Sequence, residues 1–217
     1  MRKALIFKGG WDGHTPNETS ELFKTMLEAE GVEVDIIDDM TFFDEYEPLK
    51  QYDLIVPVRT MSEITMNQCR NIAQAVSEGM GMAGCHGGMC DAFRMNELWQ
   101  FMTGGQWVAH PGNDTVTYTV NLVSGSEFTE GLQDFQITSE QYYMHVDPAV
   151  QVHATTTFPT VGGNHSPNGE VKMPVVFTKM WGKGRVFYLS IGHTYRDFEI
   201  PEAKELMRRG FLWAGNK

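Results

Sequence analysis

The chain has 217 residues and a net charge of −11, from 28 acidic against 17 basic side chains. An acidic surface repels the phosphate backbone, so we expect no nucleic-acid partner. The apolar run at residues 4–7 is too short for a signal sequence or a membrane span. The three cysteines show no disulfide framework, which favours a reducing compartment, so we expect a cytoplasmic protein. Because the apolar run is short, we also expect no membrane contact.

Apolar runs of strand length alternate with helix-like segments through the first half of the chain. We predict strands at residues 4–7, 32–37 and 53–58, and a fourth that ends at residue 85. Strands that alternate with helices are joined by crossover connections, so they form a parallel sheet. The first half is therefore predicted to be a doubly wound α/β sheet.

The two helices of this half begin with capping signals. Thr15 is followed at the third position by Glu18, and Thr65 is followed at the same spacing by Gln68. In a capping box, the threonine hydroxyl and the third side chain satisfy each other's free backbone N–H groups. We predict that both helices begin in this way.

Residues 81–88 read Gly-Met-Ala-Gly-Cys-His-Gly-Gly, an apolar run that ends in a glycine-framed turn. This pattern is typical of a nucleophile elbow, where a strained turn between a strand and a helix projects the apex side chain from the sheet. The usual apex residue is Ser or Cys, whereas here it is His86. Because side chains alternate along a strand, Cys85 is expected to point into the core.

The second half of the chain is less regular. Its alternating and apolar runs predict strands at residues 116–122, 150–154, 174–177 and 185–190. A Gly-Lys-Gly turn at 182–184 predicts a hairpin between the last two, and a final helix is expected at 201–214. We predict one domain over residues 1–217, with antiparallel strands added to a parallel core.

Three histidines follow strands of this predicted sheet: His14 after the first, His86 after the fourth and His193 after residues 185–190. Ligands of open α/β sheets bind beyond the carboxyl ends of the strands, so these histidines are expected to meet at one site. For His14 or His193 alone, a purely structural role is equally consistent with the sequence.

Other polar and aromatic residues are candidates for the same site. They are Trp11, Asp12, His110, Glu140, Tyr143 and His145. Glu140 begins a Glu-Gln-Tyr-Tyr segment, and if this segment is extended, His145 shares a face with Tyr143. His153, by contrast, is expected on the outward face of an alternating strand.

Cofactor motifs are absent from the sequence. It contains no Gly-x-Gly-x-x-Gly after the first strand, no phosphate loop and no His-Glu-x-x-His, so we expect no nucleotide cofactor. Histidines with a carboxylate suit Zn²⁺ or a similar divalent ion. A metal site remains open, because its ligands would come from scattered loops.

Together these motifs resemble the ThuA (trehalose utilisation) family. The resemblance rests on Gly9-Gly10 with His14, the elbow at 84–88, Gly105 with His110-Pro111, residues 140–143, and residues 182–188 with Gly192-His193. It implies a flavodoxin-like fold of the class I glutamine-amidotransferase type. In that fold His86 stands where the amidotransferases have their cysteine, so glutamine hydrolysis is not expected. Ser139 precedes Glu140, where the family often has Asp.

The resemblance further implies a role in the catabolism of disaccharides and related glycosides, including routes through 3-keto sugars. On this basis we predict an enzyme that uses histidine-based proton transfer or a metal-assisted elimination, isomerisation or hydrolysis. The predicted catalytic residues are His86, Glu140, His110 and His193. The predicted sugar-binding residues are Trp11, Asp12, His14, Tyr143 and His145.

Two other classes of function are consistent with the sequence. The protein could be a non-catalytic sugar-binding or regulatory module, in which the histidines only bind hydroxyl groups. It could also be a thiol-dependent hydrolase of the amidotransferase superfamily that uses Cys90 or Cys85. The sequence leaves the substrate open, and a homo-oligomer is possible.

Overall fold

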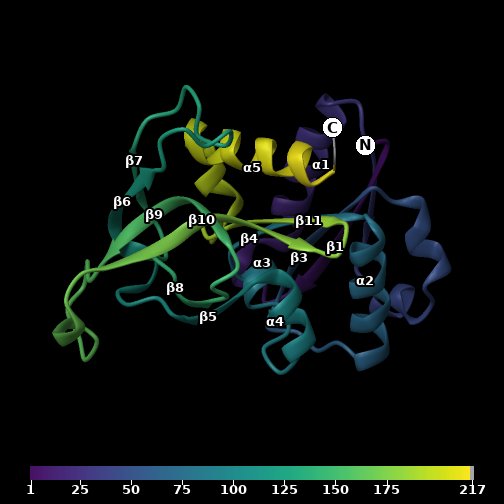
Figure 1. Cartoon of the computed structure of the whole chain (residues 1–217), viewed down its shortest axis with the longest axis horizontal. Coiled ribbons are helices and arrows are strands. Elements are labelled where there is room, and N and C mark those ends of the chain that lie inside the picture. The colour runs from purple at the N-terminus through teal and green to yellow at the C-terminus, as the bar shows by residue number, and fades with distance from the viewer. Residues whose placement is uncertain (216–217) are drawn as a thin grey trace.

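A nine-stranded mixed sheet forms the centre of the protein, in a computed structural model that describes residues 1–215 (Figure 1). The strand order is β2-β1-β3-β4-β11-β10-β9-β6-β7, and β5 and β8 form a separate two-stranded sheet. The strands are β1 (Lys3–Gly10), β2 (Glu33–Ile37), β3 (Leu54–Thr60), β4 (Gly81–Cys85), β5 (Gly105–Ala109), β6 (Thr117–Leu122), β7 (Phe135–Thr138), β8 (Tyr143–Val146), β9 (Gln151–Phe158), β10 (Val171–Trp181) and β11 (Gly184–Leu189). The helices are α1 (Pro16–Ala29), α2 (Met66–Glu78), α3 (His86–Cys90), α4 (Glu97–Thr103) and α5 (Pro201–Ala214).

Five neighbouring strands, from β2 to β11 in sheet order, run parallel to one another. The remaining four, from β10 to β7, are antiparallel to their neighbours. The doubly wound α/β fold with antiparallel additions, predicted from the sequence, is therefore confirmed. In the part of the chain that the structure describes, no helix is long and apolar enough to cross a membrane.

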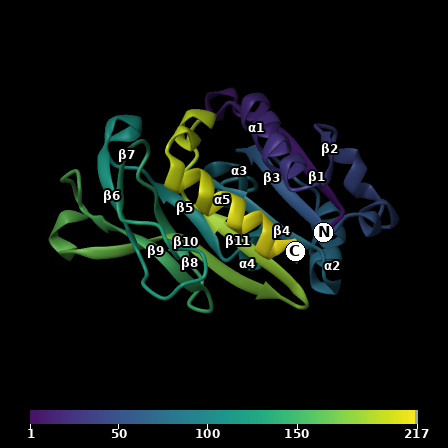
Figure 2. The same ribbon diagram turned by 90° about the horizontal axis from the view of Figure 1, so that it is seen from above.

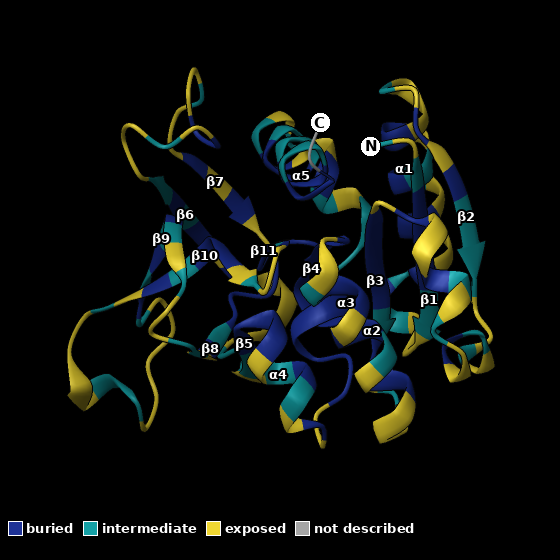
Figure 3. Ribbon diagram, turned by 45° about the vertical axis from the view of Figure 1, so that its right-hand side comes forward, coloured by how far each residue is buried: buried dark blue, intermediate teal, exposed yellow. Residues whose placement is uncertain are grey.

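Helices cover both faces of the parallel strands (Figures 1 and 2). On one face α1 and α5 pack through residues such as Phe23 and Phe211, and on the other α2 and α4 pack through Ile72 and Trp99. The inner strands β1, β3, β4 and β11 are largely buried, as the dark blue of β3 in Figure 3 shows. A parallel strand buried on both faces must be apolar throughout, which is why these strands appear as continuous apolar runs.

The capping prediction is confirmed for α2 and wrong for α1. The Gln68 amide N–H donates to Thr65 Oγ1 at 3.2 Å, and the Thr65 amide donates to the Gln68 side chain at 3.0 Å. Thr15 instead has a left-handed backbone with φ of 45° and caps nothing with its side chain. Its hydroxyl accepts a hydrogen bond from the amide of Tyr195 at 3.1 Å, so it holds two distant loops together.

The prediction that His153 lies on an outward face is also wrong. This side chain is only 3% exposed, and both of its ring nitrogens are hydrogen-bonded to hydroxyl groups. Nδ1 lies 2.8 Å from Ser126 Oγ, and Nε2 lies 2.8 Å from Thr178 Oγ1. The loop after β6 covers this face of β9, and the alternation of β9 alone could not reveal that cover.

The buried His153 makes stability depend on pH. Burial lowers its pKa to about 4, below the ordinary value near 6.5, so the unfolded chain binds its proton more tightly. Its contribution is fully present above pH 6.5 and is lost as the pH falls towards 4. Between pH 7 and pH 4.5 we expect the unfolding free energy of wild type to fall by about 2 kcal/mol more than that of His153→Gln. Urea titrations at the two pH values measure this, and equal falls would contradict it.

Candidate functional site

His86 lies at the apex of a sharp turn between β4 and α3, as the elbow pattern predicts. Its backbone is left-handed, with φ of 46°, which is a strained conformation for a residue other than glycine. A Cβ on Gly87 would lie 2.6 Å from Cε1 of His14, and a Cβ on Gly84 would lie 2.8 Å from Cβ of Met89. The flanking glycines therefore permit the turn and leave room for His14.

Four histidines surround the buried carboxylate of Glu140. Its Oε2 lies 3.0 Å from Nε2 of His86, 3.4 Å from Nδ1 of His193 and 3.9 Å from Nε2 of His14. Its Oε1 lies 3.7 Å from Nε2 of His110. Glu140 and His86 are 6% and 1% exposed, so the carboxylate and its nearest imidazole are largely shielded from water.

Second contacts fix the orientation of two of these rings. Nδ1 of His86 donates to the backbone oxygen of Ser190 at 2.8 Å, which turns its Nε2 towards Glu140. Nδ1 of His14 lies 2.8 Å from Thr60 Oγ1, which turns its Nε2 the same way. Tyr142 stacks on His86 with the ring centres 3.7 Å apart. Both imidazoles are therefore held rigidly with Nε2 pointing into the cluster.

Asp197 ties the segment that carries Glu140 to the loop that carries His193. Its Oδ2 accepts hydrogen bonds from Ser139 Oγ at 2.7 Å, from the amide of His193 at 2.9 Å and from that of Gly192 at 3.2 Å. Burial raises the pKa of Asp197 despite these donors. The side chain of Ser139, which precedes Glu140, thus helps to place the carboxylate.

Two opposing effects set the charges in the cluster: burial disfavours every charged form, and nearby groups of opposite charge favour it. Burial lowers the pKa of His86 to about 3, although Glu140 opposes this shift. Burial by itself would raise the pKa of Glu140, but the facing His14, His193 and His86 outweigh it and hold that pKa far below its usual range. Burial also opposes protonation of His193, yet its neighbour Glu140 raises the pKa of that imidazole. The carboxylate is therefore charged at neutral pH.

The cluster forms the floor of an open pocket of about 460 Å³, a size that suits a small ligand. Its lining residues are Trp11, His14, Thr60, Met61, Asp91, Arg94, Trp107, His110, Asn113, Asp114, Glu140, Tyr142 and His193. Trp11 is 46% exposed and packs edge-on against His14, with the ring centres 4.8 Å apart. An exposed indole beside polar groups gives the pocket a flat apolar wall.

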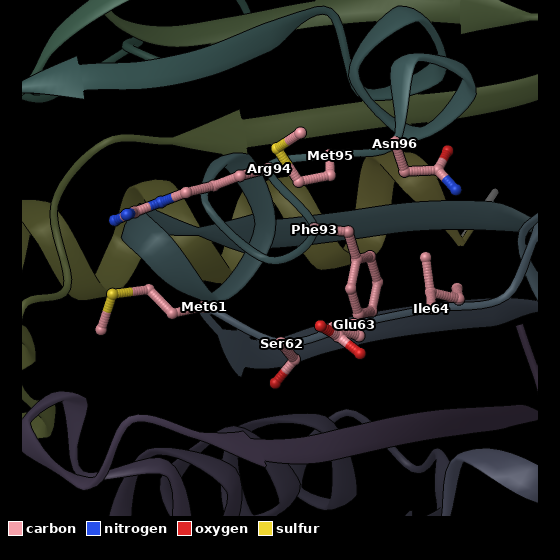
Figure 4. Close-up of a pocket in the computed structure, with 8 residues that line it drawn as sticks. All are labelled: Met61, Ser62, Glu63, Ile64, Phe93, Arg94, Met95 and Asn96. Atoms are coloured by element: carbon pink, nitrogen blue, oxygen red, sulfur yellow. The ribbon is translucent and has the colours of Figure 1, made fainter.

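A second pocket of about 420 Å³ adjoins the first and shares Met61 and Arg94 with it. Figure 4 shows these two side chains at one end of the second pocket, with Phe93 and Ile64 at the other end. Met61 is 45% exposed and has a left-handed backbone, with φ of 50°. Arg94 is held by two hydrogen bonds to Asp91, at 2.6 and 2.8 Å. The two pockets therefore adjoin at these two side chains.

The structure brings most of the predicted site residues together. Trp11, His14, His86, His110, Glu140 and His193 all lie at the first pocket or in its floor. Three others do not line it. Asp12 is exposed beside Trp11, His145 is exposed on β8, and Tyr143 packs against Phe158 on the other side of its strand.

Of the two neighbouring tyrosines, Tyr142 lines the pocket and the predicted Tyr143 does not. Side chains alternate along extended backbone, so a residue two positions from Glu140 shares its face. The prediction paired Tyr143 with His145 and did not extend the same alternation back to Glu140. Asp197 was also missed, and its only sequence signal is its place four residues after His193.

Neither candidate thiol reaches the pocket. Cys85 and Cys90 are 3% and 1% exposed, and burial raises the pKa of both. A nucleophilic cysteine needs the opposite shift, because the thiolate is the reactive form. The fold therefore provides no activated cysteine at the elbow.

Four side chains of the cluster have the donor types of a metal site. One ligand atom from each of His14, His86, Glu140 and His193 lies within 4.8 Å of the other three. Three imidazoles and one carboxylate suit a divalent transition-metal ion.

Residues 3–214 match the model of a family named ThuA and described as trehalose utilisation. Two crystal structures of ThuA-like proteins are similar to this chain. The one from Bacteroides uniformis has a TM-score of 0.74 at 20% identity and covers 98% of this chain and 91% of its own. The one from Parabacteroides merdae has a TM-score of 0.75 at 19% identity and covers 99% and 90%.

One region of a β-galactosidase from Rahnella sp. R3 has a similar fold. Its TM-score is 0.60 at 19% identity, and the match covers 95% of this chain but 31% of the galactosidase. At such identities the likeness concerns the fold alone. No curated protein sequence matches the chain.

Proposed function

This chain belongs to the ThuA family, and from that premise we propose that it is a carbohydrate-catabolic enzyme that acts on disaccharides or other glycosides. The observation that carries the proposal is the buried Glu140 carboxylate, which four histidines surround at the floor of an open pocket. Packing alone does not require a charge and several titratable rings at one point. Proton transfer, or the binding of a metal ion, does require such a group of side chains.

The chemistry best suited to this pocket starts from a 3-keto glycoside. The ketone acidifies the proton at C2, so that a base can remove it and leave an enolate across C2, C3 and the ketone oxygen. The electron pair then forms the C1–C2 double bond as the bond between C1 and the leaving oxygen breaks. An acid returns a proton to that oxygen, and the reaction needs no redox partner.

The pocket supplies the three parts that this reaction requires. The imidazole of His110, at the edge of the cluster, can serve as the group that takes and returns protons. A cationic side chain such as Arg94, which lines the pocket, or a metal ion held by the inward-facing rings of His14 and His86 would face the ketone oxygen, where negative charge develops. Trp11 offers a flat face for the sugar ring. The adjoining pocket, bounded by Met61 and Phe93, has space for the second half of a glycoside.

A non-catalytic sugar-binding role is the remaining alternative. It accounts for the exposed Trp11 and the open pocket, but it gives no reason for burying a charged Glu140 among imidazoles. Burial of a charge is costly unless a function or a partner compensates for it. Catalysis is therefore the favoured role, and turnover separates the two.

Purified wild type should release the leaving group from 3-keto glucosides, and not from the same glucosides without the ketone. His86→Ala removes the central imidazole, and we expect kcat/KM to fall by about 10²-fold or more. Chromatography of the released group measures both rates. His145→Ala, an exposed histidine outside the pocket, is the matched control and should retain full activity. Equal rates for His86→Ala and wild type, or no release by wild type from any of these compounds, would contradict the proposal.

A further inference from the structure

The two most buried histidines of the protein have opposite kinds of partner. His153 lies between two hydroxyl groups, which can donate or accept, so a neutral ring with one N–H satisfies both. His86 lies between the carbonyl oxygen of Ser190 and a carboxylate oxygen of Glu140, which can only accept. A neutral His86 donates to Ser190 and then directs a lone pair at Glu140 from 3.0 Å. The lone pair of Nε2 and the negative carboxylate therefore face each other with no proton or cation between them.

Two further rings of the cluster, those of His193 and His14, also direct a nitrogen at this carboxylate without a hydrogen bond to it. Nδ1 of His193 is buried, lies 3.4 Å from Oε2 of Glu140 and makes no hydrogen bond to any described residue. Nε2 of His14 faces the same oxygen from 3.9 Å. Three ring nitrogens thus converge on one carboxylate oxygen. Single protons would satisfy these contacts one at a time, whereas one cation would satisfy all of them together.

The spacing of these atoms fits a metal ion. Ligands about 2.1 Å from an ion in tetrahedral or octahedral geometry are about 3.0–3.4 Å apart. The contacts of Glu140 with His86 and His193, at 3.0 and 3.4 Å, match this range. The contact with His14, at 3.9 Å, is longer than this range. All four ligand atoms already lie within 4.8 Å of one another.

The contacts behind the ligands also fit. A metal-bound histidine generally donates its other N–H to a backbone carbonyl, a carboxylate or another oxygen, which fixes the ring. His86 does this through Ser190, and His14 faces the Thr60 hydroxyl in the equivalent way. These contacts orient both rings before any ion arrives.

The geometry points to a mononuclear site for a divalent first-row transition ion, Zn²⁺ or Mn²⁺ for example, held by His14, His86, Glu140 and His193. Its part in catalysis rests on the proposed function: at the floor of the pocket, the ion would bind the ketone oxygen and stabilise the enolate. His110 is not one of the four ligands, and it lies at the edge of the cluster with 28% of its side chain exposed. It is then the group that moves protons.

The metal content of the purified full-length protein, by inductively coupled plasma mass spectrometry, tests the site directly. We expect about one equivalent of a transition metal in wild type. After removal by EDTA, calorimetric titration with Zn²⁺ or Mn²⁺ should restore it. His193→Ala is the ligand variant of choice because that side chain is partly exposed, and the affinity should fall by more than 100-fold. Thr60→Val keeps the shape of its side chain but removes the contact behind His14, and should weaken binding about 10–100-fold.

Two histidine variants serve as controls. His153→Gln changes a buried histidine outside the cluster and should keep the full metal content. His110→Ala should also keep the metal while it loses turnover. The inference is overturned if wild type carries no transition metal and binds neither ion at millimolar concentration. It is overturned equally if His193→Ala binds as tightly as wild type. Metal-free protein that still releases the leaving group would support the proposed function without the metal site. Metal-loaded protein without turnover would support the metal site and contradict the proposed function.

Discussion

Glu140→Gln should abolish most of the activity while the protein stays folded. Glutamine has nearly the same shape but carries no charge, so it cannot balance a positive charge in the cluster, whether that charge lies on an imidazole or on a bound ion. The substitution removes the one anion to which His14, His86, His110 and His193 are all directed. We expect kcat/KM for 3-keto glycosides to fall by about 10³-fold, within the range for loss of a group that moves or balances protons.

The matched control for this variant is Glu170→Gln, which removes the same charge from an exposed position without a hydrogen bond or ion pair among the described residues. It should retain wild-type rates. Circular dichroism of both variants shows whether the fold is intact. A folded Glu140→Gln with a rate within threefold of wild type would remove the carboxylate from the mechanism and leave the cluster a structural feature.

Trp99→Ala should cause a large loss of stability. The indole is 1% exposed, packs edge-on against Phe93 with the ring centres 4.8 Å apart, and donates to the backbone oxygen of Met89 at 2.9 Å. Its removal leaves a large cavity and takes one hydrogen-bond donor away from the carbonyl of Met89. We expect about 4 kcal/mol of unfolding free energy to be lost.

Phe101→Ala is the control on the same helix. Its ring is 62% exposed, so the substitution should lower the unfolding free energy by less than about 1 kcal/mol. Urea denaturation followed by far-ultraviolet circular dichroism compares both with wild type. A loss below about 2 kcal/mol for Trp99→Ala would show that α4 is not a central part of the core.

The parallel half of the fold could be predicted because its signals are local. Continuous apolar runs mark the strands, and the capping residues Thr65 and Gln68 mark the start of α2. The failure at Thr15 has a physical cause, since its hydroxyl bonds the amide of Tyr195, a partner that lies far away in the sequence. The short strands β5, β7 and β8 were not predicted, because their pairing depends on distant segments more than on their own pattern.

The candidate site could be predicted in its residue types but not in its geometry. The glycines around His86 indicate a strained turn, and the strand ends indicate where His14 and His193 lie. Glu140 was a candidate only as a polar residue and through the family resemblance, and nothing local indicates that the connection between β7 and β8 would place it among the histidines. The choice of Tyr143 over Tyr142 shows that one step in the register of an extended segment changes the assignment.

The hydrogen bonds of Asp197 have a consequence for the timing of assembly. Through them, the segments that carry Glu140 and His193 hold each other in place, yet Asp197 itself comes near the end of the chain. During synthesis the parallel strands up to β4 can pair before this residue has left the ribosome. The pocket can therefore close only as a late event, after contacts between remote parts of the polypeptide have formed. A nascent chain that ends before Asp197 can pair its first parallel strands, but it lacks α5 and the completed pocket.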